Sequence, residues 1–172
     1  MIEIRIHGRG GQGAVTTGQI LAIAAFNDGM YSQTFPKFGV ERRGAPVEAF
    51  VRIDEEKINL RSGIYNPNIV IVLDASLMNT IDVTKGMPKD GMLIVNTNKN
   101  PKNKFKTYTV DATGIAMEVM NKPIVNTAML GAFAKITGIV TLNSLKKAID
   151  EKFSNDLGYL NKKTTEKVFH ST

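Results

Sequence analysis

The sequence predicts an α/β domain with a mainly parallel sheet and helices on both faces. Three observations support this prediction. The chain has 172 residues and 42% hydrophobic content, which suffices for one compact core. Short runs rich in β-branched residues alternate with helical stretches, as in sheets whose strands are buried on both sides. The first run ends in a glycine-rich turn and a helical segment. We expect a single domain over residues 1–172.

Six apolar runs have the length and composition of buried strands. They are Ile2–His7, Tyr31–Phe35, Val47–Ile53, Ile69–Leu73, Met92–Val95 and Thr107–Val110. None approaches the roughly 18 apolar residues of a membrane span. The sequence begins in the first strand and shows no signal-peptide pattern. We therefore expect a soluble, cytoplasmic protein without membrane contact.

Helical periodicity follows the first strand and dominates the C-terminal half. The apolar residues expected on one face of the first helix are Val15, Ile20, Ile23, Ala24 and Phe26. Asp111 is placed to cap a helix over Ala112–Met120, and Asn126 to cap one that ends at Gly138. Two more helices are expected, one from about Ser144 and a polar one over residues 156–169.

A glycine-rich loop joins the first strand to the first helix, in a Rossmann-like arrangement. Its glycines match the pattern G-x-G-x-x-G. Glycine permits positive φ and close approach of a ligand to bare backbone, and the following helix start favours anions. The loop predicted to bind an anionic group or a docked partner consists of Gly8, Arg9, Gly10, Gly11, Gln12 and Gly13.

A dinucleotide site also needs an acidic residue about twenty positions further on, at the end of the second strand. That strand, Tyr31–Phe35, ends without one; Asp28 precedes it and Glu41 follows in the next loop. A free-standing NAD(P)- or flavin-binding module is therefore the alternative hypothesis. A structural turn without a ligand is the other alternative for the loop.

The second feature is the segment PKFGVERRGAP between the second and third strands, which lacks helical periodicity. Guanidinium groups offer a planar fork of donors for phosphate or interchain ion pairs. A surface loop with an internal salt bridge from Glu41 is the alternative. The residues that we expect to dock on a partner are Phe38, Gly39, Glu41, Arg42, Arg43 and Gly44.

Other polar residues carry weaker signals. Asp74 follows a strand, where it either meets a ligand or caps a helix. Residues at the start of a late helix either line a cleft or cap and fill it: Asn126, Thr127 and Met129. The chain has no cysteine, and His7 and His170 lie at opposite ends of the sequence. We expect neither catalytic nor metal-ligating residues.

The formal net charge is +6, and the basic residues are spread along the chain. The densest stretch, residues 99–106, has the composition of a solvated turn. No aromatic-rich sheet motif or recognition-helix signature accompanies it. Nucleic-acid binding is therefore not expected, whereas phosphorylated metabolites and acidic partner subunits suit the charge.

Several motifs in fixed order resemble one family. They are HGRGGQG at His7–Gly13, FPKFGVERRGAPVEAFVRI at Phe35–Ile53, VDAT at Val110–Thr113 and NTAMLGA at Asn126–Ala132. Together they resemble the gamma subunit of 2-oxoacid:ferredoxin oxidoreductases, above all the pyruvate and 2-oxoisovalerate members. The resemblance covers about the whole chain.

The resemblance implies a non-redox subunit of a heteromeric enzyme. Such an enzyme oxidatively decarboxylates a 2-oxoacid, here pyruvate by a narrow preference, to acyl-coenzyme A and CO2, and reduces ferredoxin. Alpha, beta and delta subunits are the implied partners, and they hold thiamine diphosphate, magnesium and [4Fe–4S] clusters; this chain binds none of these. By the same resemblance Arg9 and Gln12 form the polar rim of the family's turn. The basic loop and the helix N-terminus lead to the hypothesis that they face a partner subunit near the coenzyme A path. Phe38 and Arg42–Gly44 then belong to a loop that docks on the alpha or beta subunit.

Overall fold

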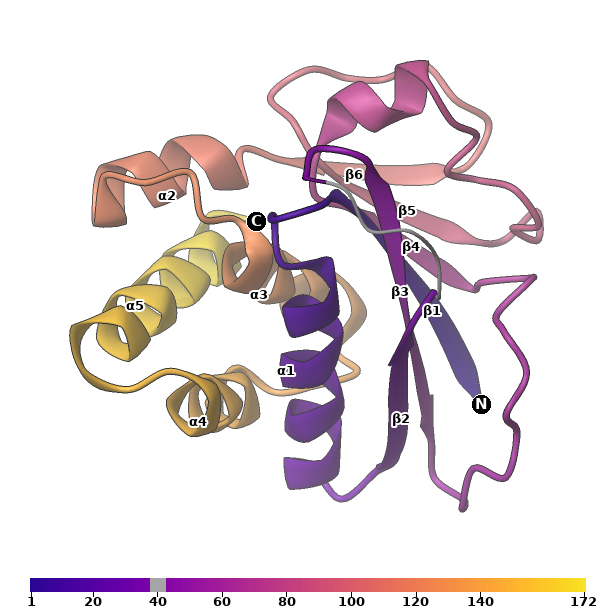
Figure 1. Ribbon diagram of the computed structural model, residues 1–172, viewed down its shortest axis with the longest axis horizontal. Coiled ribbons are helices and arrows are strands. Elements are labelled where there is room, and N and C mark those ends of the chain that lie inside the picture. Colours follow the sequence, from indigo (N-terminus) through magenta and orange to yellow (C-terminus); the bar gives the residue numbers. More distant parts are fainter. Residues whose placement is uncertain (38–42) are drawn as a thin grey trace.

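The structure is a computed structural model that describes residues 1–37 and 43–172. Its centre is a six-stranded sheet with the order β2-β3-β1-β4-β5-β6 (Figure 1). The strands are β1 (Ile2–Arg9), β2 (Tyr31–Pro36), β3 (Pro46–Asp54), β4 (Ile69–Val72), β5 (Met92–Asn96) and β6 (Lys106–Val110). Each of the six runs expected from the sequence forms a strand, with ends that differ by one or two residues.

The sheet is mainly parallel, as expected. Strands β1, β4, β5 and β6 run in one direction, and β3 lies antiparallel between β1 and β2. The reversal follows from the length of the connection: only residues 37–45 separate β2 from β3, and a parallel crossover needs about a dozen residues or more. The register pairs Arg9 at the end of β1 with Pro46 at the start of β3. The glycine loop, Gly8–Gly13, therefore lies beside the end of the segment PKFGVERRGAP, which we call the arginine-containing loop.

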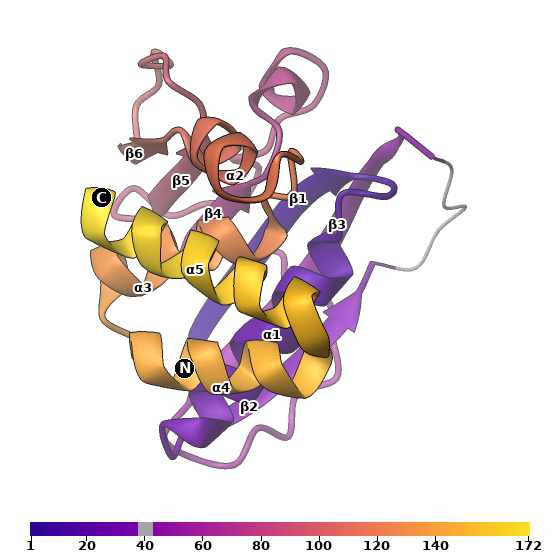
Figure 2. The ribbon, with the colours of Figure 1, turned by 90° about the vertical axis from the view of Figure 1, so that its left-hand side faces the viewer.

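The α/β class is confirmed, with an unequal cover of the two faces. The α-helices are α1 (Ala14–Asn27), α2 (Ala112–Met120), α3 (Asn126–Thr137), α4 (Leu142–Lys152) and α5 (Asn155–Ser171). All five lie on one side of the sheet, with α1 against β1, β2 and β3 (Figures 1 and 2). The other side carries the 3-10 helix η1 (Ala75–Asn79) and connecting loops. The segments before and after β4 contain no long stretch with helical periodicity. They therefore add no α-helix to that side of the sheet.

Successive side chains of a strand point to opposite faces of the sheet, so the core consists of two clusters. Ile4 and Ile6 of β1 belong to the large cluster under the α-helices. Val70 and Val72 of β4 belong to a smaller cluster on the opposite face, which η1 closes. Arg5 and His7 point to that opposite face as well and are buried. One face of β1 is thus apolar and the other is polar.

Two local expectations need correction. Phe26 does not join the buried face of α1 but is 70% exposed, whereas Ala24 and Ala25 of the same turn are buried. Asn126 is not an N-cap: Val125 precedes the helix as its cap residue, and the Asn126 side chain accepts from Thr127 N–H at 2.9 Å within the first turn. Asp111 does cap α2, accepting from Gly114 N–H at 2.8 Å.

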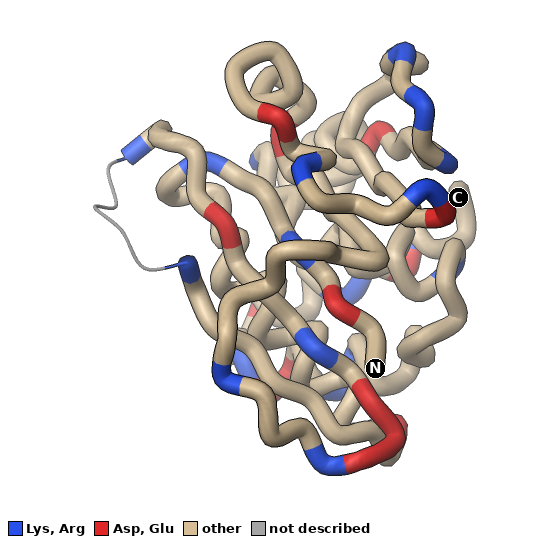
Figure 3. Tube along the Cα trace, turned by 90° about the vertical axis from the view of Figure 1, so that its right-hand side faces the viewer, with Lys and Arg blue, Asp and Glu red and all other residues tan. Residues whose placement is uncertain are grey.

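Charged residues are dispersed over the face that the α-helices leave uncovered (Figure 3). Lys, Arg, Asp and Glu alternate there along the strands and the loops beside them. Among the described residues, no helix combines the length and the apolar character that crossing a bilayer requires.

Candidate functional site: a glycine corner at the carboxyl end of β1

The glycine loop turns the chain sharply from β1 into α1. Gly11 and Gly13 have φ values of +93° and +80°, in the left-handed region that favours glycine. Gln12 closes the turn: its backbone N–H donates to the Arg9 carbonyl at 2.9 Å, and its Oε1 accepts from Arg9 N–H at 2.8 Å. Gln12 therefore acts mainly on the loop's own backbone.

The start of α1 lies against the start of α3. Gly13 is the cap residue of α1, and no side chain caps this end. A Cβ atom at Gly13 would lie 2.7 Å from Asn126 Nδ2, so the amide would have to shift, and the φ of +80° strains any other residue at this position. Among residues 1–37 and 43–172, no side chain accepts from the N–H groups of the first turn of α1, where the positive end of the helix dipole lies.

Arg9 joins three segments that are distant in sequence. Its Nε donates to Asp74 Oδ2 at 2.9 Å, its Nη1 to the Gly44 carbonyl at 3.0 Å, and its Nη2 to Ser76 Oγ at 2.8 Å. These contacts engage all three nitrogens of the guanidinium. Arg9 therefore acts as a clamp between the ends of β1 and β4 and the residues that precede β3.

Of the two roles that its sequence position left open, Asp74 takes that of a helix cap. It caps η1 by accepting from Ser76 N–H at 2.9 Å and Ser76 Oγ at 2.6 Å, and it also receives Arg9 and, at 3.3 Å, Gln12 Nε2. Burial alone would raise the pKa of Asp74, but the hydrogen bonds from Ser76, Arg9 and Gln12 outweigh it and lower the pKa. The ionised carboxylate therefore balances the charge of Arg9.

The end of the arginine-containing loop completes this arrangement. Gly44 N–H donates to the Gly10 carbonyl at 3.1 Å, and Gly10 N–H to the Ala45 carbonyl at 2.8 Å. Arg43 is exposed beside them. We call this set, Gly8–Gly13, Arg43–Ala45, Asp74 and Ser76, the glycine corner. The other expected docking residues lie outside the described residues: Phe38, Gly39, Glu41 and Arg42.

The residues expected at the start of α3 have different roles. Thr127 is buried and donates through Oγ1 to Asn161 Oδ1 at 2.6 Å, which ties α3 to α5. Met129 is buried in the main core. Only Asn126 reaches the glycine corner, through its contact with Gly13. The small and polar residues of this motif thus serve close packing between helices.

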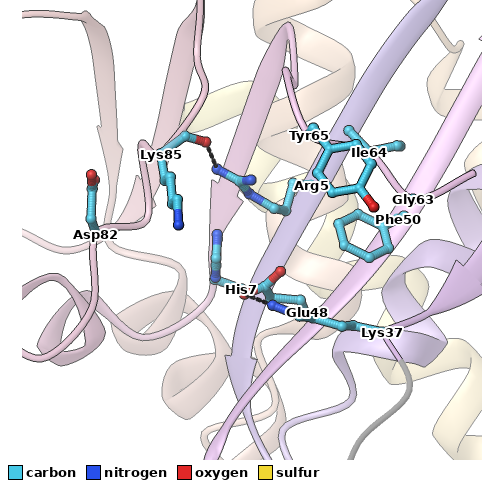
Figure 4. A pocket seen from close by; sticks show the side chains of 10 residues that line it. All are labelled: Arg5, His7, Lys37, Glu48, Phe50, Gly63, Ile64, Tyr65, Asp82 and Lys85. Carbon is cyan, nitrogen blue, oxygen red and sulfur yellow. Dashed lines mark hydrogen bonds and ion pairs between the residues drawn. The ribbon is translucent and has the colours of Figure 1, made fainter.

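Sequence reasoning missed a polar cavity on the uncovered face, between β1, β3 and the loops beside them (Figure 4). Its signal was present as the alternation of charged residues in two strands, Arg5 and His7 in β1 and Glu48 in β3. Only the register shows that they meet, because it places His7 opposite Glu48. Within residues 1–37 and 43–172, no group of three or more His, Asp and Glu could hold a metal ion.

The whole chain is similar to proteins of one family. Residues 3–170 match the family described as pyruvate ferredoxin/flavodoxin oxidoreductase. "Pyruvate synthase subunit PorC" of Methanocaldococcus jannaschii is 58% identical over 171 residues, which cover 99% of this chain and 96% of that protein. "Pyruvate/ketoisovalerate oxidoreductases common subunit gamma" of Thermococcus kodakarensis is 55% identical, over 100% of this chain and 97% of that protein.

Solved structures share the fold. The pyruvate oxidoreductase subunit PORC of Thermotoga maritima superposes with a TM-score of 0.85 at 38% identity, over 98% of this chain and 95% of that one. The 2-oxoglutarate:ferredoxin oxidoreductase of Magnetococcus marinus, solved with 2-oxoglutarate, coenzyme A and succinyl-CoA, has a TM-score of 0.78 at 20% identity. The match covers 99% of this chain but 31% of that longer chain. In that protein the same fold is one part of a larger polypeptide.

Proposed function

Because the chain belongs to the pyruvate ferredoxin/flavodoxin oxidoreductase family, we propose that its glycine corner is the surface by which it docks on a partner subunit. The chain is a gamma subunit of a pyruvate or related 2-oxoacid:ferredoxin oxidoreductase. Within our proposal its partners are alpha, beta and delta subunits, its substrate is pyruvate and its location is the cytoplasm. A free-standing NAD(P)- or flavin-binding module is not favoured, since the relatives are named as subunits.

We place the redox chemistry on the other subunits. This chain has no cysteine for an iron–sulfur cluster. It also lacks the GDG motif and downstream asparagines that accompany thiamine diphosphate and magnesium. Its own residues therefore do not suit either cofactor, and we assign it no step in the electron transfer. We propose that the gamma subunit contributes a docking surface that holds a partner subunit in place.

One observation carries the docking proposal, namely the Arg9 clamp. Two motifs separated by about thirty residues meet at one edge of the sheet because Arg9 and Gly10 bind Gly44 and Ala45. Gly44 and Ala45 are held by the sheet and by the half-buried Arg9, so they lose little conformational entropy when a partner binds them. The exposed guanidinium of Arg43 at this corner offers a partner carboxylate a bidentate contact.

We propose that coenzyme A contacts backbone N–H groups and not the side chain of Arg9. The Arg9 guanidinium is already engaged, and Asp74 neutralises it. The open N–H groups at the start of α1 are the donors that suit a phosphate oxygen. We propose that the corner borders the coenzyme A path of the assembled enzyme, with Arg9 as a positioning residue for the loop.

The test is made on the complex assembled from all subunits. Arg9→Ala removes the clamp, and we expect an increase in the coenzyme A KM of about tenfold or a comparable loss of assembly, the size expected for losing hydrogen bonds to charged groups. Arg61→Ala, at an exposed arginine in the segment between β3 and β4, is the matched control. Normal assembly with an unchanged coenzyme A KM in Arg9→Ala would overturn the role of the corner.

The arginine-containing loop has its own test. Arg42→Ala and Arg43→Ala, singly and together, are expected to weaken association of the gamma subunit while the thermal transition of the free chain stays unchanged. Size-exclusion chromatography of the mixed subunits measures the first quantity, and circular dichroism the second. If both variants assemble and turn over as the wild type does, the docking role of this loop is wrong.

A further inference from the structure

The uncovered face of the sheet holds a cavity of about 320 Å³. Arg5 and His7 of β1 and Phe50 of β3 lie along the sheet, while Ile64 and Tyr65 come from the segment that precedes β4. In Figure 4 the aromatic and aliphatic side chains gather on one side and the charged ones on the other. The volume is at the lower end of the range of small-molecule sites, which are also apolar with a few placed polar groups.

Buried nitrogens of two residues that line the polar side of the cavity have no hydrogen-bond partner among the described residues. His7 is 2% exposed, and neither of its ring nitrogens makes a hydrogen bond of good geometry among the described residues, although the Val83 carbonyl lies near enough to act on its pKa. Arg5 is held through Nη2 by the carbonyls of Val83 at 3.0 Å and Lys85 at 2.5 Å, but its Nε is buried and has no partner in the described part of the chain. A buried donor left unpaired costs about 1–3 kcal/mol, so folding does not favour this arrangement for its own sake.

Both carboxylates that line the cavity already have partners. Glu48 accepts from Lys37 Nζ at 3.0 Å, and Asp82 accepts from Thr84 N–H at 3.0 Å and from Thr84 Oγ1 at 2.7 Å. The lining has three cations, Arg5, Lys37 and Lys85, against the two carboxylates, which leaves one net positive charge. The ammonium of Lys85 has no ion pair within the described part of the chain.

We propose that this cavity is a binding site for a small monocarboxylic acid with an apolar body. Its carboxylate faces Arg5, His7 and Lys85, and its body lies against Phe50, Ile64 and Tyr65. A dianion such as a phosphate monoester suits the site less, because Glu48 and Asp82 also line it and the net charge is that of a single cation.

Two further features fit this ligand class. Burial lowers the pKa of His7 to about 4, further lowered by Arg5 and Lys37 and only partly offset by Glu48 and the Val83 carbonyl. The neutral ring therefore offers one N–H donor without adding positive charge. Tyr65 is 76% exposed at the mouth, where a bound apolar group would cover its ring. The proposal uses no residue of the glycine corner and does not depend on its role.

The test uses the full chain and 3-phenylpropanoate, with its uncharged amide, 3-phenylpropanamide, as the matched ligand. Calorimetry is expected to give saturable binding of the acid with a millimolar Kd, the range for a ligand of about eleven non-hydrogen atoms. The amide is expected to bind about tenfold or more weakly, since it lacks the charge-assisted hydrogen bonds. Equal binding of the two compounds, or no saturable binding of the acid, would overturn the proposal.

Location is tested separately by NMR and by a pair of lysine variants. The acid is expected to shift the ring signals of His7 and leave those of His170 unchanged. Lys85→Gln should weaken binding about two- to fivefold, the size for an exposed ion pair, whereas Lys89→Gln, at an exposed lysine outside the cavity lining, should not. Shifts at His170 in place of His7, or equal affinities of the two variants, contradict this site.

Discussion

The burial of His7 makes the stability of the fold depend on pH between 7 and 5. The folded chain holds the ring neutral because burial lowers its pKa from the usual 6.5 to about 4. The unfolded chain, with a pKa near the usual value, takes up a proton as the pH falls through about 6.5. Protonation thus favours the unfolded state, so the contribution of His7 is complete above that pH and is lost on acidification towards pH 4.

The magnitude follows from the difference between the two pKa values. A difference of about 2.5 units corresponds to ~3 kcal/mol when the pH is below both values, at 1.36 kcal/mol per unit. Between pH 7 and pH 5 the linkage relation gives a loss of ~2 kcal/mol. This window lies above the range in which most carboxylates are protonated, so it isolates the histidine.

Urea unfolding of the full chain at pH 7, 6 and 5 measures this loss. In His7→Gln the pH-dependent part should disappear, whatever the absolute stability of the variant. In His170→Gln, at an exposed position near the end of α5, the wild-type dependence should remain. The reasoning is refuted if His7→Gln loses as much stability as the wild type between pH 7 and pH 5.

Two stability predictions concern the helical layer. Gly131→Ala places a methyl group against the backbone carbonyl of Thr165, where α3 and α5 pack closely. We expect a destabilisation of ~1–3 kcal/mol by chemical unfolding, despite the better helix propensity of alanine; a stabilised variant would show that the helices separate at no cost. Asp28→Ala removes acceptors at 2.7 Å from Thr141 N–H and at 2.6 Å from Ser144 Oγ, which join the end of α1 to the start of α4. We expect Asp28→Ala to lower the free energy of unfolding by ~2 kcal/mol. Asp28→Asn keeps one acceptor oxygen and should lose less stability. Equal stability of Asp28→Ala and the wild type would contradict the link.

Local sequence patterns were sufficient for the elements. Each of the six strands follows from a short run of β-branched residues, and Asp111 marks the start of α2 through a side chain that caps it. Phe26 shows the limit of such patterns. From its spacing we expect it on the buried face of α1, but Ala24 and Ala25 occupy the buried positions of the last turn, and the ring of Phe26 stays exposed.

The candidate site could be predicted only in part. The positive φ of Gly11 and Gly13 is a local property of the turn, and the sequence indicates it. The partners of Arg9 are not local: Gly44, Asp74 and Ser76 follow it by 35, 65 and 67 positions. No periodicity in the chain encodes those distances.

The sequence by itself determined the α/β class, the strands, the glycine turn and the family to which the chain belongs. These depend on backbone preferences and on motifs that are contiguous in the chain. The tertiary structure alone decided that the α-helices share one face of the sheet, that Arg9 is a clamp, and that His7 and Arg5 line a cavity. Strand order and register bring these residues together, and they result from the packing of the whole chain and not from any one segment.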